Sequence, residues 1–340
     1  MTHLLLAAAI GIGVNYNWYA FHLESMHDCS TNRESRSVGT WILPQYGDGR
    51  VRATVQRQLA AMHASGFTTL RVLVFHDHST GTEDDSFTSL DGSLMPADAR
   101  KLHDFVGDVA RAGFRSLELG PAFVNENSLY CNRHVWGDCF DPKRSDENWR
   151  FISGVATTAI GAAGSMPLRF DLGNEQAPDP RMPAATLQNA KKYFGTIATR
   201  FQTAFGSIWL ISSARSDASN AGETADRLNL LVDDLSAAGL KPPFLEVHTY
   251  SADGNDLKQS LDDAQRIAQN VGANVILGEL PYHSAVQAKT VAGWIARNPD
   301  SRLIDVLQWP ERDPSEVCAV DPVPPYTPGP YYNVGSTRRM

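Results

Sequence analysis

The chain has 340 residues, of which 42% are hydrophobic, and this content is ample for a sizeable buried core. Its formal net charge is −8 at pH 7, and no basic stripe runs along it, which argues against nucleic acid or an anionic membrane as a partner. No apolar run approaches the roughly 18 residues of a membrane span. Residues 4–14 resemble the apolar region of a signal peptide but lack a preceding Lys or Arg, and their later part also fits a strand, so both interpretations stay open.

Strand and helix signals alternate along the whole chain. Eight short apolar or β-branched runs predict strands at 12–18, 68–76, 115–123, 168–175, 207–213, 244–250, 275–280 and 303–309. Helical periodicity lies between them, most clearly at 52–65, 96–112, 187–205 and 257–271. Seven intervening helices are predicted, and the eighth is missing or short.

Glycines mark the ends of the predicted helices. Six of them follow a helical run shortly before a strand: Gly66, Gly113, Gly164, Gly206, Gly239 and Gly272. Glycine is favoured there because the position past a helix often needs a positive φ. Eight such βα units predict a single (β/α)8 TIM barrel with its core at 12–310. A doubly wound open sheet is the alternative, but it would need a Gly-rich phosphate turn that Gly11-Ile12-Gly13 does not supply.

Two long loops and a proline-rich tail interrupt this regular pattern. The loops at 19–49 and 124–145 follow strands one and three, so in a barrel they lie on the C-terminal face, where barrel enzymes build their sites. Residues 311–340 include five prolines between positions 322 and 330 and predict an irregular tail wrapped along the barrel.

The four cysteines show no zinc-binding spacing. Cys131 and Cys139 flank a short polar loop, while Cys29 and Cys318 follow the first and last strands, which are neighbours in a closed barrel. Two disulfides are therefore expected, with a secreted or periplasmic location. Four unpaired cysteines in a cytosolic enzyme are the alternative.

Polar and aromatic residues gather at the predicted strand ends, which converge on one cleft in a barrel. They are Asn15, Asn17, Arg71, His76, His78, Asn125, Glu126, Asn174, Glu175, Ser212, Arg215, His248, Tyr250, Glu279, Gln308 and Trp309. Among them, Glu175 and Glu279 lie at the ends of strands four and seven. Glycoside hydrolysis needs such a pair, one carboxyl to protonate the leaving oxygen and one on the other side of the anomeric carbon. Their pKa values must differ, and Arg71 is a candidate donor to the ionised one.

The glutamate pair resembles that of the clan GH-A retaining glycoside hydrolases, which include families 5, 10, 39 and 51. The resemblance covers 12–309 and rests on Asn174-Glu175 after strand four and Glu279 after strand seven. It implies that Glu175 is the general acid/base, that Glu279 is the nucleophile, and that Asn174 binds the sugar 2-hydroxyl. Two features depart from family 5, since Gln176 replaces the usual proline and the third strand lacks the histidines common there.

Four further residues extend the resemblance. His248-Thr249-Tyr250 on strand six is similar to the clan's His-x-Tyr, Trp309 to its sugar-platform tryptophan, and Arg71 to the arginine of family 5. The resemblance implies that Tyr250 hydrogen-bonds the nucleophile, that His248 lines the cleft near the acid/base, and that Trp309 stacks under the sugar. Asn15 and His76 complete the predicted substrate-binding set.

Metal-dependent chemistry fits the sequence less well than glycoside hydrolysis. His76 and His78 point the same way on a strand and can share a metal, but strands one and five lack the histidines of metal-dependent amidohydrolase barrels. No metal or cofactor is expected. Glu118 and Asp171, which lie mid-strand, are interpreted as barrel-interior ion pairs. The expected protein is a monomeric glycosidase acting on a β-linked poly- or oligosaccharide; a metal-dependent hydrolase and a non-catalytic glycan-binding barrel are the alternatives.

Overall fold

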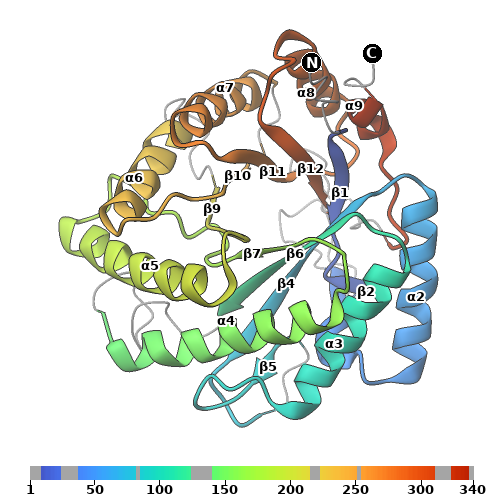
Figure 1. The fold of residues 1–340 in the computed structure, drawn as a ribbon. Coiled ribbons are helices and arrows are strands. Elements are labelled where there is room, and N and C mark those ends of the chain that lie inside the picture. Colours follow the sequence, from blue (N-terminus) through green and yellow to red (C-terminus); the bar gives the residue numbers. More distant parts are fainter. Residues whose placement is uncertain are drawn as a thin grey trace, which may run out of the picture.

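The computed structural model describes residues 9–23, 37–81, 85–123, 140–214, 223–250, 254–310 and 323–336. Within these ranges, parallel strands form a nearly closed barrel that helices surround (Figure 1). The predicted (β/α)8 TIM barrel is confirmed. All four cysteines, with Asn125, Glu126 and Arg215 from the predicted strand ends, lie outside the described residues.

The ladder of paired strands is continuous around the barrel except within the fifth predicted strand. Its strands are β1 (Gly11–Asn15), β4 (Thr69–Asp77), β6 (Ser116–Phe123), β7 (Leu168–Asp171), β8 (Trp209–Leu210), β9 (Ser212–Ala214), β10 (Phe244–His248), β11 (Asn274–Pro281) and β12 (Leu303–Trp309). The fifth predicted strand is split at Ile211, and its halves bridge the barrel because β8 pairs with β7 while β9 pairs with β10. On the other side, β1 pairs with β12 and sets Val14 opposite Gln308.

Helices cover the outside of the barrel. They are α2 (Gly49–Ala64), α3 (Pro96–Arg111), α4 (Pro142–Ala162), α5 (Ala184–Phe205), α6 (Glu223–Ala237), α7 (Gly254–Val271) and α8 (Ala285–Arg297). All six glycines predicted to end helices have a positive φ, from 59° at Gly164 to 111° at Gly66. No helix in the described ranges is both long and apolar enough to cross a membrane.

The eighth helix is short, as predicted, and belongs to the tail. A 3-10 turn, η2 (Gly329–Tyr331), leads into α9 (Tyr332–Ser336) beside α8 and β1. Tyr331 and Val334 are buried in the main apolar core. The described part of the tail therefore packs along the barrel and supplies the short eighth helix.

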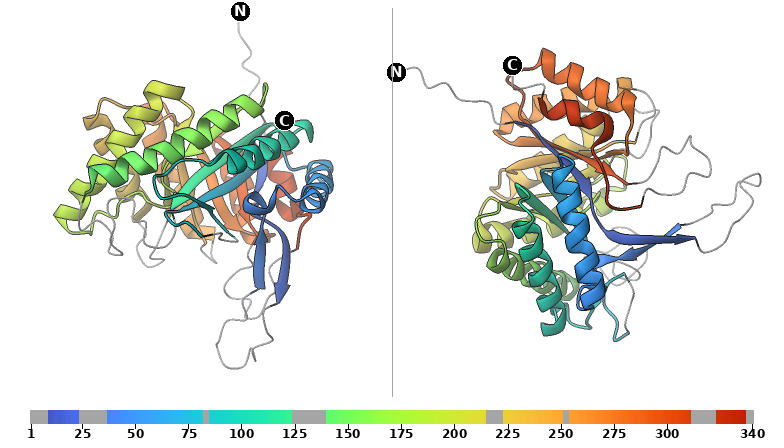
Figure 2. Two further views of the ribbon diagram at one scale, coloured as in Figure 1. Left: turned by 90° about the horizontal axis from the view of Figure 1, so that it is seen from below. Right: turned by 90° about the vertical axis from the view of Figure 1, so that its right-hand side faces the viewer.

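The first predicted strand ends earlier than expected. β1 stops at Asn15, and Trp18 begins a hairpin of β2 (Trp18–Leu23) with β3 (Ser37–Trp41), followed by α1 (Ile42–Gln45). Asn17 stabilises the chain between β1 and β2. Its side-chain oxygen accepts from the N–H of Leu73, and its carbonyl accepts from the N–H of Ile42. The hairpin projects from the barrel (Figure 2). A second short strand, β5 (Phe87–Thr88), pairs with β4.

Because side chains alternate between the two faces of each strand, the protein has two buried regions, one between barrel and helices and one inside the barrel. The apolar residues Leu70, Val72 and Val74 of β4 join the main core between barrel and helices. The inward-facing positions are largely charged and buried: Arg71, Glu118, Arg169, Asp171, Glu246 and Asp305. These charges contact one another, as in the 2.7 Å pair of Arg169 with Asp305, because an unpaired buried charge is strongly destabilising. Their interaction with Arg71 confirms Glu118 and Asp171 as barrel-interior ion pairs.

Candidate active site

The guanidinium of Arg71 is fully buried and contacts both the predicted nucleophile and the residues around it. Its Nη1 donates to Glu279 Oε1 at 2.7 Å and to Asn15 Oδ1 at 2.8 Å. Its Nη2 donates to Asn174 Oδ1 at 2.5 Å, and its Nε donates to Glu118 Oε1 at 2.8 Å. One planar fork from β4 therefore fixes residues from four other strands or strand ends.

Glu279 is held at both carboxylate oxygens. Arg71 donates to Oε1, and the hydroxyl of Tyr250 donates to Oε2. The side chain is 4% exposed. Burial raises the pKa of Glu279 above its ordinary value, although nearby His248 and Arg71 favour the ionised form. The predicted donor role of Arg71 and the implied contact of Tyr250 with Glu279 are both present.

The sequence predicted Glu175 at the end of a strand, but in the structure it lies in a turn. β7 stops at Asp171, and Glu175 has a φ of 56°, in the left-handed region that few non-glycine residues adopt. Its N–H donates to Ser212 Oγ at 2.8 Å, and Ser212 Oγ donates to Asp171 Oδ2 at 2.7 Å. The Glu175 side chain is 38% exposed, so this turn presents it to solvent.

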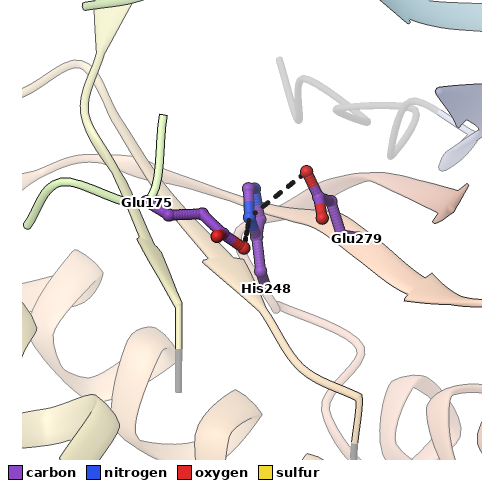
Figure 3. Close-up of side chains that lie close together, drawn as sticks. All are labelled: Glu175, His248 and Glu279. Carbon is purple, nitrogen blue, oxygen red and sulfur yellow. Dashed lines mark hydrogen bonds and ion pairs between the residues drawn. The ribbon is translucent and has the colours of Figure 1, made fainter. Parts of the chain in front are cut away.

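His248 lies between the two glutamates (Figure 3). Its Nδ1 is 2.9 Å from Glu175 Oε1 and 3.4 Å from Glu279 Oε1, and its Nε2 is 3.1 Å from Glu246 Oε1. Burial disfavours a charged ring, but the carboxylates of Glu279, Glu175 and Glu246 outweigh it and raise the pKa of His248 to about 10. Burial likewise opposes ionisation of Glu175, yet the hydrogen bond and charge of His248 lower the pKa of Glu175 overall.

The ligand atoms of Glu175, His248 and Glu279 all lie within 4.8 Å of one another, and this is the cluster of such groups found among the described residues. A metal ion would need a neutral imidazole nitrogen and free carboxylate oxygens. Here the buried guanidinium of Arg71 already donates to Glu279 Oε1 at 2.7 Å, so a cation lies beside the cluster. The donor set therefore suits ion pairing better than metal binding.

The predicted residues do not all meet in the cleft. Asn174, Arg71, His248 and Tyr250 surround the two glutamates, as the contacts above show. Trp309 is half-buried and lies beside Trp18 of the hairpin, with ring centroids 5.5 Å apart.

Two predicted substrate-binding residues are placed differently from the expectation. Asn15 is fully buried, holds Arg71 and donates to the carbonyl of Gly278 at 2.9 Å, so it supports the cleft from below. His76 is separated from the cleft, since it packs on Phe151 of α4 at 4.5 Å and its Nε2 lies 2.9 Å from Ser89 Oγ. The physical reason is alternation: His76 is five positions from Arg71 on one strand, so it faces the helices.

Glu246 contacts His248 and Arg71 and is not among the residues predicted from the strand ends. It lies two positions before His248 on β10, so period-two alternation places both on the same face. The spacing of two from His248 is the sequence signal for Glu246, which lies one layer below the strand ends.

No protein-family model and no curated protein matches the sequence. Solved structures do resemble it. A GH5-4 broad specificity endoglucanase from Clostridium longisporum aligns with a TM-score of 0.59 and 12% identity over 99% of this chain and 97% of its own. A β-mannanase from the blue mussel Mytilus edulis gives 0.56 and 12% over 88% and 86%. The GH53 catalytic domain of Ignisphaera aggregans gives 0.53 and 12% over 74% and 76%. At these identities the likeness concerns the fold, and the (β/α)8 barrel of this chain is thus one that it shares with glycoside hydrolases.

Proposed function

We propose that the protein is a retaining glycoside hydrolase that cleaves β-linked poly- or oligosaccharides with Glu175 and Glu279. The observation that carries the proposal is that these two carboxyl groups lie side by side, with one oxygen of each within 4.8 Å of the other. Carboxyl groups about 5 Å apart are typical of retaining enzymes, whereas inverting enzymes keep a wider gap for water. The endoglucanase and β-mannanase neighbours support a β-glycan as substrate.

The environments of the two glutamates support different roles. Glu279 is buried and oriented by Arg71 and Tyr250, as suits a nucleophile that attacks the anomeric carbon. Glu175 is partly exposed and contacts His248, as suits a group that gives a proton to the leaving oxygen and later takes one from water.

Asn174 is oriented for substrate by the same arginine. Its Oδ1 accepts from Arg71, which leaves its Nδ2 as the donor for a sugar hydroxyl. Trp309 and Trp18 supply aromatic faces at the rim for the apolar face of a pyranose. Export from the cytoplasm and a monomeric state remain part of the proposal.

Turnover assays on β-mannan, β-galactan and β-glucan test the proposal. Glu175→Gln and Glu279→Gln should each lower kcat by about a thousandfold or more, because each removes one chemical role. Glu223→Gln is the matched control, since Glu223 is also a buried, ion-paired carboxylate but lies on α6 and contacts Arg227. NMR of the first-formed product should show a retained anomeric configuration.

Three results would contradict the proposal. Full turnover in Glu175→Gln would remove the acid/base role, and an inverted product would remove the double displacement. Tight binding of a glycan with no hydrolysis under any condition would support a non-catalytic glycan-binding barrel instead.

A further inference from the structure

A carboxylate with no role in the double displacement lies directly beneath His248. Glu246 is fully buried on β10, and its Oε1 is 3.1 Å from His248 Nε2 and 3.3 Å from Arg71 Nε. The chain leaves room for it at Gly278, where a Cβ would lie 1.6 Å from the same Oε1. The residue before Glu279 is therefore a glycine whose missing side chain makes space for Glu246.

This contact fixes which ring nitrogen of His248 serves the cleft. Burial opposes ionisation of Glu246, but Arg71 and His248 outweigh it and lower its pKa, so it is an anion that can only accept. His248 must then keep a proton on Nε2. The other nitrogen, Nδ1, becomes the ring atom that exchanges a proton with Glu175 at 2.9 Å.

We propose that Glu246 is a positioning residue that keeps an exchangeable proton on the His248–Glu175 pair, so that His248 Nδ1 is the store from which Glu175 is protonated. This inference rests on the proposed glycosidase function and extends it by one layer. It also explains how Glu175 works as an acid although its own carboxyl is ionised in the free protein.

The proton balance closes over one catalytic cycle. The Nδ1–H bond of His248 breaks as an O–H bond forms on Glu175, and that proton moves to the glycosidic oxygen as the C–O bond breaks. His248 is then neutral with Nε2–H on Glu246, Glu175 is ionised, and the sugar is bonded to Glu279. In the second step water attacks the anomeric carbon as its bond to Glu279 breaks, and a proton of that water returns through Glu175 to Nδ1.

The charges around His248 favour the stored proton. Carboxylates face the ring from three strands or strand ends, namely Glu246 at 3.1 Å, Glu175 at 2.9 Å and Glu279 at 3.4 Å, with Asp171 further away. Arg71 is the opposing cation. Removing Glu246 takes away the one carboxylate that contacts Nε2 and does not take part in the chemistry.

The first test needs no substrate, so it is independent of the glycosidase proposal. NMR of the 15N-labelled imidazoles, with His248 assigned by its loss in His248→Gln, should give a titration midpoint near pH 10 in the wild type. In Glu246→Gln the midpoint should fall by about one unit or more, because an anionic partner is lost. A wild-type midpoint near the ordinary 6.5, or no shift in the variant, overturns the inference.

The second test is the pH dependence of kcat/KM. Activity should fall at high pH as the stored proton is lost, and in Glu246→Gln this basic limb should move to lower pH by about one unit or more. Glu246→Asp, which keeps the charge, should move the basic limb less than Glu246→Gln does.

Glu118→Gln is the matched control for the second test. Glu118 lies beside Arg71 and Glu246, and glutamine keeps its size, an oxygen that accepts from Arg71 and an amide that can donate to Glu246. The basic limb should stay in place. A loss in Glu246→Gln that is equal at every pH would mean a merely structural role and overturn the inference. If Glu246→Gln does not fold, the wild-type NMR midpoint and Glu246→Asp still decide.

Discussion

The N–H of Glu175 donates to the hydroxyl of Ser212 at 2.8 Å, and this bond anchors a residue whose φ is 56°. Ser212→Ala should therefore lower kcat by about tenfold with little change in KM, because the acid/base would lose its anchor but the sugar contacts would remain. The free energy of unfolding should fall by about 1–3 kcal/mol, since Asp171 also loses a donor. Steady-state kinetics and denaturant unfolding measure both. Ser213→Ala is the control on the other face of the strand, and equal kcat in the two variants would contradict the anchor.

Arg71→Lys should affect both stability and activity. Lysine keeps the charge but loses the planar fork that reaches Glu279 and Asn174, and it leaves buried carboxylates poorly paired. We expect a loss of about 3–5 kcal/mol in the free energy of unfolding and a fall in kcat/KM of about a hundredfold or more. The control is Arg115→Lys, because Arg115 pairs with Asp305 but is 43% exposed, so its loss should stay below about 1 kcal/mol. Equal effects would show that the fork has no special role.

The acid limb of activity should report Glu279. Because burial raises the pKa of Glu279, the nucleophile is ionised above that raised value and activity is lost as the pH falls through it. The limb should therefore lie at a higher pH than the ordinary glutamate value. Tyr250→Phe removes a donor to the ionised form and should move the limb to still higher pH. Tyr282→Phe, a tail contact, should leave it unchanged. A limb in Tyr250→Phe that coincides with the wild type would refute this coupling.

Trp309 should act on substrate affinity. If its half-buried ring supports the sugar at the cleavage point, Trp309→Ala should raise KM by about tenfold. The KM of Trp309→Phe should lie between those of the wild type and Trp309→Ala. The measurement is the KM for an oligosaccharide of fixed length. An unchanged KM in Trp309→Ala would assign the ring to packing against Trp18.

The sequence predicted the order of the barrel and the place of Glu175 and Glu279, since hydrophobic periodicity and the helix-ending glycines are local signals. His76 was predicted to bind substrate because it lies near a strand end, without regard to which face of the strand its side chain is on. The turn at Glu175 and the split at Ile211 depend on hydrogen bonds between strands, such as that to Ser212, which no local pattern contains. Glu246 was not predicted because it lies within its strand, below the strand-end residues, where Gly278 of the neighbouring strand leaves room for it.

The seam between β1 and β12 has a consequence for how the chain acquires its structure. Asn15 donates to the carbonyl of Gln308, 293 positions away, and the same residue holds Arg71. Such a long-range pairing has a high loop-closure entropy and forms late. Until β12 docks, β1 presents an unpaired edge on which other chains can add. We therefore expect slow refolding, with aggregation that increases with protein concentration, and the site around Arg71 forming among the last parts of the molecule.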